Sequence, residues 1–295
     1  DLLIALVSII WGSSYLLMKL GLADLGVFNL IALRFGIAFL ITLPLFWQRL
    51  RRASRQTLGY AALLGLVLFG TFTALMFGLQ TTPTSSAGFL TSTAVVFVLL
   101  IQIAITKRLP RPLTLIGTIF TLIGIAFLTI KGSFSLAGGS LLCLLGAFCY
   151  GCHIVVTNYL TRKTDGIAMA VYQLGFAGLY GLLFSFLFET PTLPQTTAGW
   201  LAVLGLAIIC SALGIVIQTY AQRYTTPERT GLLFCLEPVA AAFLGFIFLQ
   251  EVLPFSGYLG ALLVLGGVAL SGLPPRRLSS HRPLYFWRPS TEKEH

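Results

Sequence analysis

The sequence predicts an all-α polytopic membrane protein with ten transmembrane helices, arranged as two inverted five-helix repeats. Three observations lead to this fold class. Apolar residues make up 57% of the 295-residue chain and charged residues only 9%, whereas about a quarter of the residues in soluble domains are charged. The apolar residues gather in long runs, and the second half of the chain repeats features of the first.

Ten apolar runs define the predicted helices. A helix needs about 20 mostly apolar residues to cross the hydrocarbon core of a bilayer. The runs cover residues 2–22, 28–47, 58–79, 85–105, 112–130, 137–159, 167–188, 198–222, 229–250 and 255–273. Each half of the chain holds five of them.

The internal repeat shows in short segments that recur at a constant spacing. Gln80–Pro83 is matched by Tyr224–Pro227, and Lys107–Pro110 by Glu251–Pro254, both at an offset of 144 residues. Because five helices is an odd number, the second half must enter the membrane upside down relative to the first, as in many secondary transporters. We expect residues 1–130 to form the first repeat, residues 131–273 the second, and residues 274–295 a basic cytoplasmic tail.

The net charge of +10 reports orientation in the membrane and gives no indication of nucleic-acid binding. Sixteen of the basic residues fall in alternate loops and the tail, whereas the opposite loops contain only Lys131. Basic loops stay in the cytoplasm, so both termini are predicted to be cytoplasmic. Attraction to anionic lipid would strengthen this placement.

Polar and charged residues within the first two helices are the first candidates for a binding site. Trp11, Ser14 and Tyr15 share one face of helix 1 because residues three and four apart lie on the same side. They would line a cavity, unless the serines only support helix contacts. Arg34 lies about two turns inside helix 2, where a charge needs a partner or water. It either lines an outer vestibule or extends to the interface.

The second repeat offers counterparts. Tyr150 and His153 correspond to Trp11 and Ser14 at an offset of 139 residues, and Gln173 corresponds to Arg34. His153 is either functional or a hydrogen-bonded structural residue, and Gln218 in helix 8 is a candidate hydrogen-bonding group for a substrate. The haem-attachment pattern C-x-x-C-H occurs at Cys149–His153 but inside an apolar helix, so no haem, metal or other cofactor is expected.

Glu237, followed by Pro238, is the one acidic residue at clear membrane depth. A buried carboxyl group favours its protonated form, and a proline bends the helix that contains it. Glu237 could carry a proton, neutralise a cationic group, or stabilise the bend by a hydrogen bond.

These features resemble the drug/metabolite transporter superfamily, and most closely its EamA-type exporters. The resemblance rests on Trp11–Gly12 in helix 1, on Glu237–Val239 leading to Gln250–Glu251 in helix 9, and on the paired halves, and it covers about residues 1–273. It implies alternating access, a central cavity lined by both halves, and export of amino acids or related small metabolites.

The first repeat departs from the pattern of that family. Thr93–Ala94 stands where the family often has a proline, and Thr106–Lys107 stands where it often has Gly-Glu.

We therefore expect a secondary transporter in the bacterial inner membrane, with Glu237 as the candidate for proton coupling. A multidrug or organic-cation exporter is the main alternative, and an uncoupled channel or lipid scramblase is another. An enzyme is not expected, because His153 and Glu237 alone make no nucleophile–base pair. The expected partners are a small-molecule substrate and membrane lipids, and the protein is expected to be a monomer or homodimer.

Overall fold

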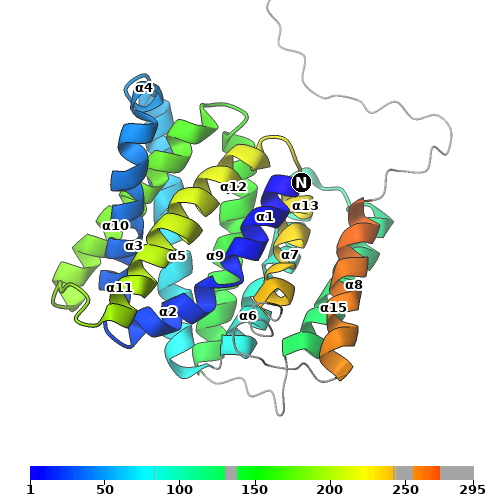
Figure 1. Cartoon of the computed structure of the whole chain (residues 1–295). Helices are drawn as coiled ribbons and strands as arrows, with labels where there is room; N and C mark the ends of the chain where they lie inside the picture. Colours follow the sequence, from blue (N-terminus) through cyan, green and yellow to red (C-terminus); the bar gives the residue numbers. More distant parts are fainter. Residues whose placement is uncertain (83, 130–137, 242, 244–254, 273–295) are drawn as a thin grey trace, which may run out of the picture.

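The computed structural model describes residues 1–82, 84–129, 138–241, 243 and 255–272. Every regular element among these residues is a helix, and they contain no strand. The helices lie side by side in a bundle, with the N-terminus at one end beside α13 (Figure 1).

The first half contains eight helices. They are α1 (Leu2–Trp11), α2 (Ser14–Leu22), α3 (Val27–Leu45), α4 (Trp47–Leu50), α5 (Arg55–Thr81), α6 (Thr84–Ser92), α7 (Ala94–Thr106) and α8 (Pro112–Thr129). The second half contains α9 (Gly138–Leu160), α10 (Gly166–Phe188), α11 (Thr197–Leu204), the π-helix η1 (Gly205–Leu213), α12 (Gly214–Gln222), α13 (Pro227–Phe234) and α15 (Phe255–Gly272).

Seven helical stretches in the described part are long and apolar enough to cross a membrane. They are Leu2–Leu22, Val27–Leu45, Arg55–Thr81, Ala87–Thr106, Gly138–Leu160, Gly166–Phe188 and Thr197–Gln222, and shorter apolar helices cover Pro112–Phe127 and Phe255–Ser271. The predicted run 229–250 extends beyond the described residues. This pattern is consistent with a polytopic membrane protein.

Several of the predicted helices are interrupted, and a proline explains one of the breaks. The first run is divided into α1 and α2 at Gly12–Ser13, although Leu2–Leu22 as a whole is long and apolar enough to cross a membrane. Another break follows Phe234, because Pro238 has no N–H to donate to the carbonyl four residues before it. Ser8 Oγ donates to that Phe234 carbonyl instead, at 3.2 Å. A third break, at Thr93, occurs without a proline.

Close helix contacts depend on glycine in the α8–α15 pair, which stands at one side of the bundle (Figure 1). A Cβ on Gly117 would lie 2.5 Å from the Gly267 carbonyl oxygen, and one on Gly124 would lie 2.6 Å from that of Gly260. The two backbones therefore touch along an antiparallel seam that only small residues permit.

Acidic side chains of the loops connect the two halves at one end of the bundle. Glu189 accepts hydrogen bonds from the backbone N–H groups of Phe28 and Asn29 at the start of α3 (3.1 and 2.9 Å). Asp24 accepts from the N–H groups of Gln195 (2.9 Å) and Thr196 (3.1 Å) before α11. The hydrogen bond from the Thr196 backbone lowers the pKa of Asp24 below its usual value.

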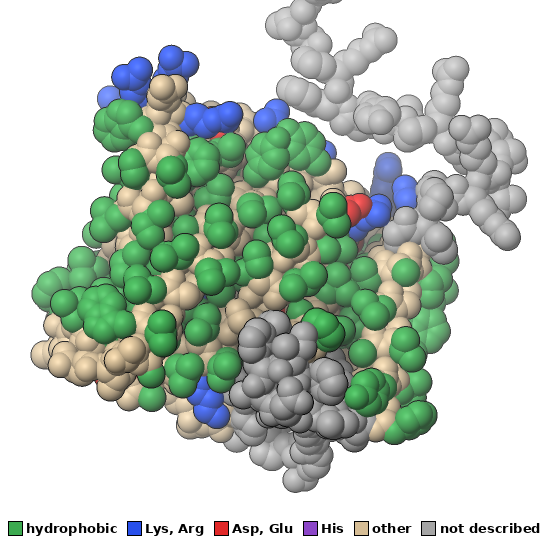
Figure 2. Space-filling model, in the orientation of Figure 1, with side chains coloured by type: hydrophobic (Ala, Val, Ile, Leu, Met, Phe, Trp, Pro, Cys, Tyr) green, Lys and Arg blue, Asp and Glu red, His purple; other side chains and the backbone are tan. Residues whose placement is uncertain are grey.

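Charge separates the two ends of the molecule. The visible lysine and arginine side chains gather mainly at the end that holds α4 and the N-terminus, and the sides are covered by apolar side chains (Figure 2). The exposed apolar residues include Leu40, Phe120, Leu183 and Leu262. Apolar sides of this kind suit contact with the hydrocarbon core of a bilayer. The basic side chains lie mainly at one end of the bundle.

Candidate functional site

A small cavity lies in the middle of the bundle, where interrupted helices from both halves meet. Its lining residues are Trp11, Ser14, Tyr15, Met18, Arg34, Thr71, Phe72, Leu75, Thr91, Tyr150, Ile215 and Glu237. Its volume is only about 30 Å³. The cavity is therefore narrow.

Close packing at the break in the first span places Trp11 and Tyr15 at this cavity. A Cβ on Gly12 would lie 2.8 Å from the backbone nitrogen of Ala241. The absence of a side chain therefore lets the break between α1 and α2 rest on the chain that follows Pro238. Ser13 Oγ bonds back to the Ile10 carbonyl at 2.8 Å.

Trp11 is fixed by a hydrogen bond and by aromatic contacts. Its indole Nε1 donates to the carbonyl of Cys210 in η1 at 2.7 Å. The ring lies 6.1 Å from that of Tyr150 and 5.2 Å from that of Phe234, centre to centre. A Cβ on Gly214 would lie 2.5 Å from Nε1, so the glycine makes room for the indole. π-Helical turns such as η1 are frequent at functional sites.

Arg34 lies wholly within the protein and is 1% exposed. Its Nε donates to Ser211 Oγ at 2.7 Å, and its guanidinium carbon lies 4.1 Å from the centre of the Phe72 ring. The side chain does not extend to the interface, so that interpretation of the sequence is wrong. Its NH1 has no hydrogen-bond partner in the described structure, which is costly for a buried charged donor.

Glu237 brings an acidic group to the same cavity as Arg34. The ion pairs within the described residues are Arg49–Asp165 and Arg229–Asp1, so Arg34 and Glu237 do not contact each other directly. No hydrogen bond of the described residues holds the Glu237 carboxyl group at the helix bend, which gives no support to a purely structural role. The lining of the cavity thus contains one basic residue, one acidic residue and several aromatic rings.

His153, Gln173 and Gln218 form a second polar cluster, beside the cavity and outside its lining. His153 Nε2 lies 3.1 Å from Gln173 Oε1, and Gln173 Nε2 donates to Thr219 Oγ1 at 2.9 Å. Gln218 Nε2 donates to Gln222 Oε1 at 3.4 Å. All five side chains are fully buried. This cluster joins α9, α10 and α12, and the hydrogen bond of His153 matches the structural interpretation of that residue.

Six of the nine residues proposed from the sequence thus line one cavity, namely Trp11, Ser14, Tyr15, Arg34, Tyr150 and Glu237. The other three lie in the neighbouring cluster. Sequence reasoning did not identify Phe72 or Thr91 as cavity residues, nor Ser211 as the partner of Arg34. The sequence contained one indication of a residue such as Ser211: a buried arginine needs a hydrogen-bond partner. Substrate contact by any of these residues stays a prediction.

Comparison with known proteins gives a consistent result over nearly the whole chain. The profile of the EamA-like transporter family matches residues 1–130 and 137–273. An uncharacterized transporter of Archaeoglobus fulgidus is 28% identical over 273 residues, covering 92% of this chain and 85% of its own length. The uncharacterized transporter YoaV of Bacillus subtilis is 24% identical, over 90% of this chain and 94% of its own.

Two further similarities concern a named activity and the fold. A protein of Streptantibioticus cattleyicolor, described as a probable terminal-alkyne amino-acid exporter, is 26% identical over 90% of this chain and 91% of its own. A solved crystal structure matches with a TM-score of 0.78, covering 94% of this chain and 98% of that one, at 22% identity. The latter similarity supports the fold alone.

Proposed function

Because the chain belongs to the EamA-like transporter family, we propose that it is a secondary transporter that exports amino acids or related zwitterions. The observation that carries this proposal is that Arg34 and Glu237 both line one cavity. An amino acid presents a carboxylate to a basic group and an ammonium to an acidic group. The exporter name of one relative points to the same substrate class.

Arg34 is suited to bind the substrate carboxylate. Its Nε is already held by Ser211, and its NH1 is buried and lacks a partner in the described structure. Arginine–carboxylate hydrogen bonds are short and strong because both groups are charged. A carboxylate beside NH1 would satisfy the donor that the cavity leaves unpaired.

Glu237 is suited to bind the ammonium group, and the rings of Trp11, Tyr15 and Tyr150 around it favour a cation as well. This arrangement also fits the alternative of an organic-cation exporter. Arg34 weighs against that alternative, since a buried positive charge in the same cavity repels a substrate that carries only a cation.

The small cavity supports alternating access. Its volume is about 30 Å³, so we expect the helices to move apart to admit an amino acid. The interruptions beside the cavity, at Gly12–Ser13, Thr93 and Phe234–Glu237, leave backbone that can pivot. Substrate sites of secondary transporters commonly lie between such discontinuous helices.

Ten spans in two inverted repeats are supported by reciprocal packing. In the sequence, Gly117 and Gly124 of the first half correspond to Gly260 and Gly267 of the second. In the structure, Gly117 meets Gly267 and Gly124 meets Gly260. Exchanging the halves maps each contact onto the other, as a two-fold axis between antiparallel helices requires. The α3–α10 pair would cross the same axis.

The basic end gives the proposed orientation. Arg49, Arg51 and Arg52 precede α5 and Arg55 begins it, and further arginines lie between α7 and α8. By the positive-inside rule this end faces the cytoplasm, together with both termini, and the protein resides in the bacterial inner membrane.

The test compares ligands that differ by one charged group. Purified protein is first screened by thermal shift against the standard amino acids, since a ligand that binds the folded state raises the melting temperature. The best amino acid is then compared with its amide, which lacks the carboxylate, and with its N-acetyl derivative, which lacks the ammonium.

The proposal expects both derivatives to bind the unchanged protein about tenfold more weakly or worse, since each loses a charge-assisted hydrogen bond. Arg34→Gln should abolish the preference for the acid over the amide, and Glu237→Gln the preference for the free amine. Binding of the amide as tightly as the acid would instead favour the cation exporter. Flux in proteoliposomes that does not saturate would favour a channel or scramblase.

A further inference from the structure

A larger cavity, separate from the transport site, lies at the basic end of the bundle. Its volume is about 500 Å³. The end of α7, the turn before α8, the beginnings of α8 and α13 and the end of α15 surround it. The lining includes Arg108, Arg111, Arg229, Thr114, Thr226 and Ser271.

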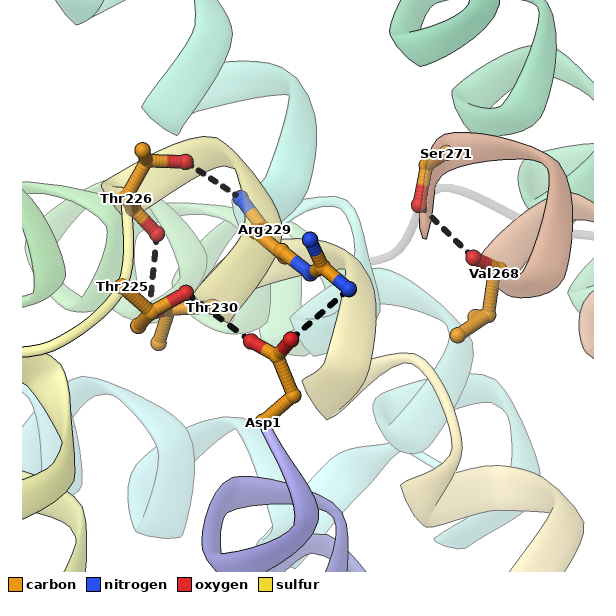
Figure 3. A network of polar contacts seen from close by, with 7 residues as sticks. All are labelled: Asp1, Thr225, Thr226, Arg229, Thr230, Val268 and Ser271. Atoms are coloured by element: carbon orange, nitrogen blue, oxygen red, sulfur yellow. Dashed lines mark hydrogen bonds and ion pairs between the residues drawn. The ribbon is translucent and has the colours of Figure 1, made fainter. Parts of the chain in front are cut away.

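Positive charge dominates this cavity, because three arginines line it against the single carboxylate of Glu228. Arg229 is already engaged, since its NH2 lies 2.7 Å from Asp1 Oδ2. Asp1 in turn accepts a hydrogen bond from Thr225 Oγ1 at 3.1 Å. Figure 3 shows this network and, apart from it, Ser271 with its hydrogen bond to the Val268 carbonyl. Arg229 thus holds the wall of the cavity in place, and its charge is largely neutralised by Asp1.

Arg108 and Arg111 are the free cations. Neither guanidinium has a hydrogen-bond or ion-pair partner within the described residues. Both belong to the turn between α7 and α8, where Lys107 adopts a left-handed conformation with φ of 54°.

The lining also has an apolar part formed by Ile103, Leu109 and Leu232, beside the polar Gln102 and Thr106. Leu109 is 79% exposed and the neighbouring Ile116 of α8 is 44% exposed. A cavity that is basic at one side and continuous with an apolar protein surface suits a molecule with an anionic head and a hydrocarbon body.

We propose that this cavity binds a phosphate group, supplied by the headgroup of an anionic phospholipid. Arginine binds phosphate through paired, charge-assisted hydrogen bonds. Basic pockets between transmembrane helices at the cytoplasmic side are a recurring place for such headgroups. The lipid would join the α7–α8 turn to α13 and α15 and so stabilise the contact of the α8–α15 pair with the bundle. This inference requires a membrane-embedded chain but does not depend on the substrate proposed above.

The experiment measures the thermal stability of the full-length protein in a neutral detergent. Phosphatidylglycerol, phosphatidylcholine and inorganic phosphate are titrated separately. The test variant is Arg108→Gln/Arg111→Gln. The matched control is Arg51→Gln/Arg55→Gln, which removes two exposed charges from the same end but outside the cavity.

Phosphatidylglycerol should raise the melting temperature of the unchanged protein and of the control, whereas phosphatidylcholine should not. The apparent affinity of the test variant for phosphatidylglycerol should be roughly tenfold weaker. Native mass spectrometry of lipid-bound protein gives the same comparison on the folded fraction, even where the substitutions lower stability.

Equal affinity of the test variant and the control for phosphatidylglycerol would overturn the proposal. So would equal stabilisation by phosphatidylcholine, which would indicate a general effect of lipid. Stabilisation by inorganic phosphate as strong as that by phosphatidylglycerol would overturn the lipid source and assign the cavity to a soluble phosphate anion.

Discussion

Ser211→Ala is a small substitution with a large expected effect. Ser211 is fully buried on η1, and its Oγ accepts the hydrogen bond of Arg34 Nε at 2.7 Å. It is the one hydrogen-bond acceptor that the described residues offer the Arg34 side chain. Alanine at this position removes the acceptor and leaves a buried cation with no hydrogen bond at either Nε or NH1.

The magnitude follows from the charge of the donor. A hydrogen bond to a charged group contributes about 1.5–3 kcal/mol to the free energy of unfolding, so Ser211→Ala should lower stability by about that amount. If Arg34 also binds the substrate carboxylate, its loss of orientation should weaken amino-acid binding as well. If returning Arg34 to its binding orientation costs the same free energy, the dissociation constant of the amino acid should be about 10 to 150 times higher.

The assay is denaturant unfolding in mixed micelles, together with thermal-shift titration of the best amino acid. Ser185→Ala is the matched control, because Ser185 is equally buried and its Oγ has no hydrogen-bond partner in the described structure. This control should leave both quantities nearly unchanged. Equal losses of stability in the two variants would refute the importance of the Arg34–Ser211 hydrogen bond.

Four other predictions test topology, coupling, packing and a loop contact. A cysteine at Leu193 should react with an impermeant thiol reagent added outside the cell, and one at Arg51 should not, because the basic end is expected to face the cytoplasm; the opposite labelling would reverse the orientation. Glu237→Gln should abolish accumulation driven by a pH gradient in proteoliposomes while downhill exchange persists, and an unchanged response would remove Glu237 from the coupling mechanism. Gly124→Leu should destabilise the protein by several kcal/mol, since a Cβ there already meets the Gly260 carbonyl oxygen at 2.6 Å and overpacking typically costs about 1–3 kcal/mol or more; Gly59→Leu, where a Cβ meets nothing within 4 Å, is the control. The pKa of Asp24 is lowered in the folded protein, so the contacts of its carboxylate stabilise the fold at neutral pH and are lost as the carboxylate protonates. The stability difference between the unchanged protein and Asp24→Asn should therefore shrink below about pH 4.

The sequence predicted the helical class and most helix positions because hydropathy is a local property. A run such as 167–188 is apolar throughout, and α10 covers Gly166–Phe188. The break at Gly12–Ser13 depends on a contact with Ala241, more than two hundred residues away. The break at Thr93 has no proline to announce it. Neither could be predicted from neighbouring residues.

The candidate site was predictable in part for a similar reason. Helical periodicity identifies residues that share one face, and it correctly grouped Trp11, Ser14 and Tyr15 at the cavity. It does not determine how helices rotate relative to one another. It therefore could not predict that Tyr150 lines the cavity whereas His153, on the same face of α9, contacts Gln173 instead. Phe72 is one of 23 phenylalanines, and only its position over Arg34 distinguishes it.

The enclosed position of Trp11 has a practical consequence for observing the protein at work. Its indole is 6% exposed, whereas Trp47 is 54% and Trp200 is 38% exposed. In the described part of the chain, Trp11 is thus the one indole enclosed by protein. Parting of the helices around the cavity would break its hydrogen bond to Cys210 and hydrate the ring, so its fluorescence emission would shift to longer wavelength. With Trp47, Trp200 and Trp287 replaced by phenylalanine, the remaining tryptophan emission would come from Trp11. Trp11 would then be an optical sensor within the site that follows opening and closing without any attached dye.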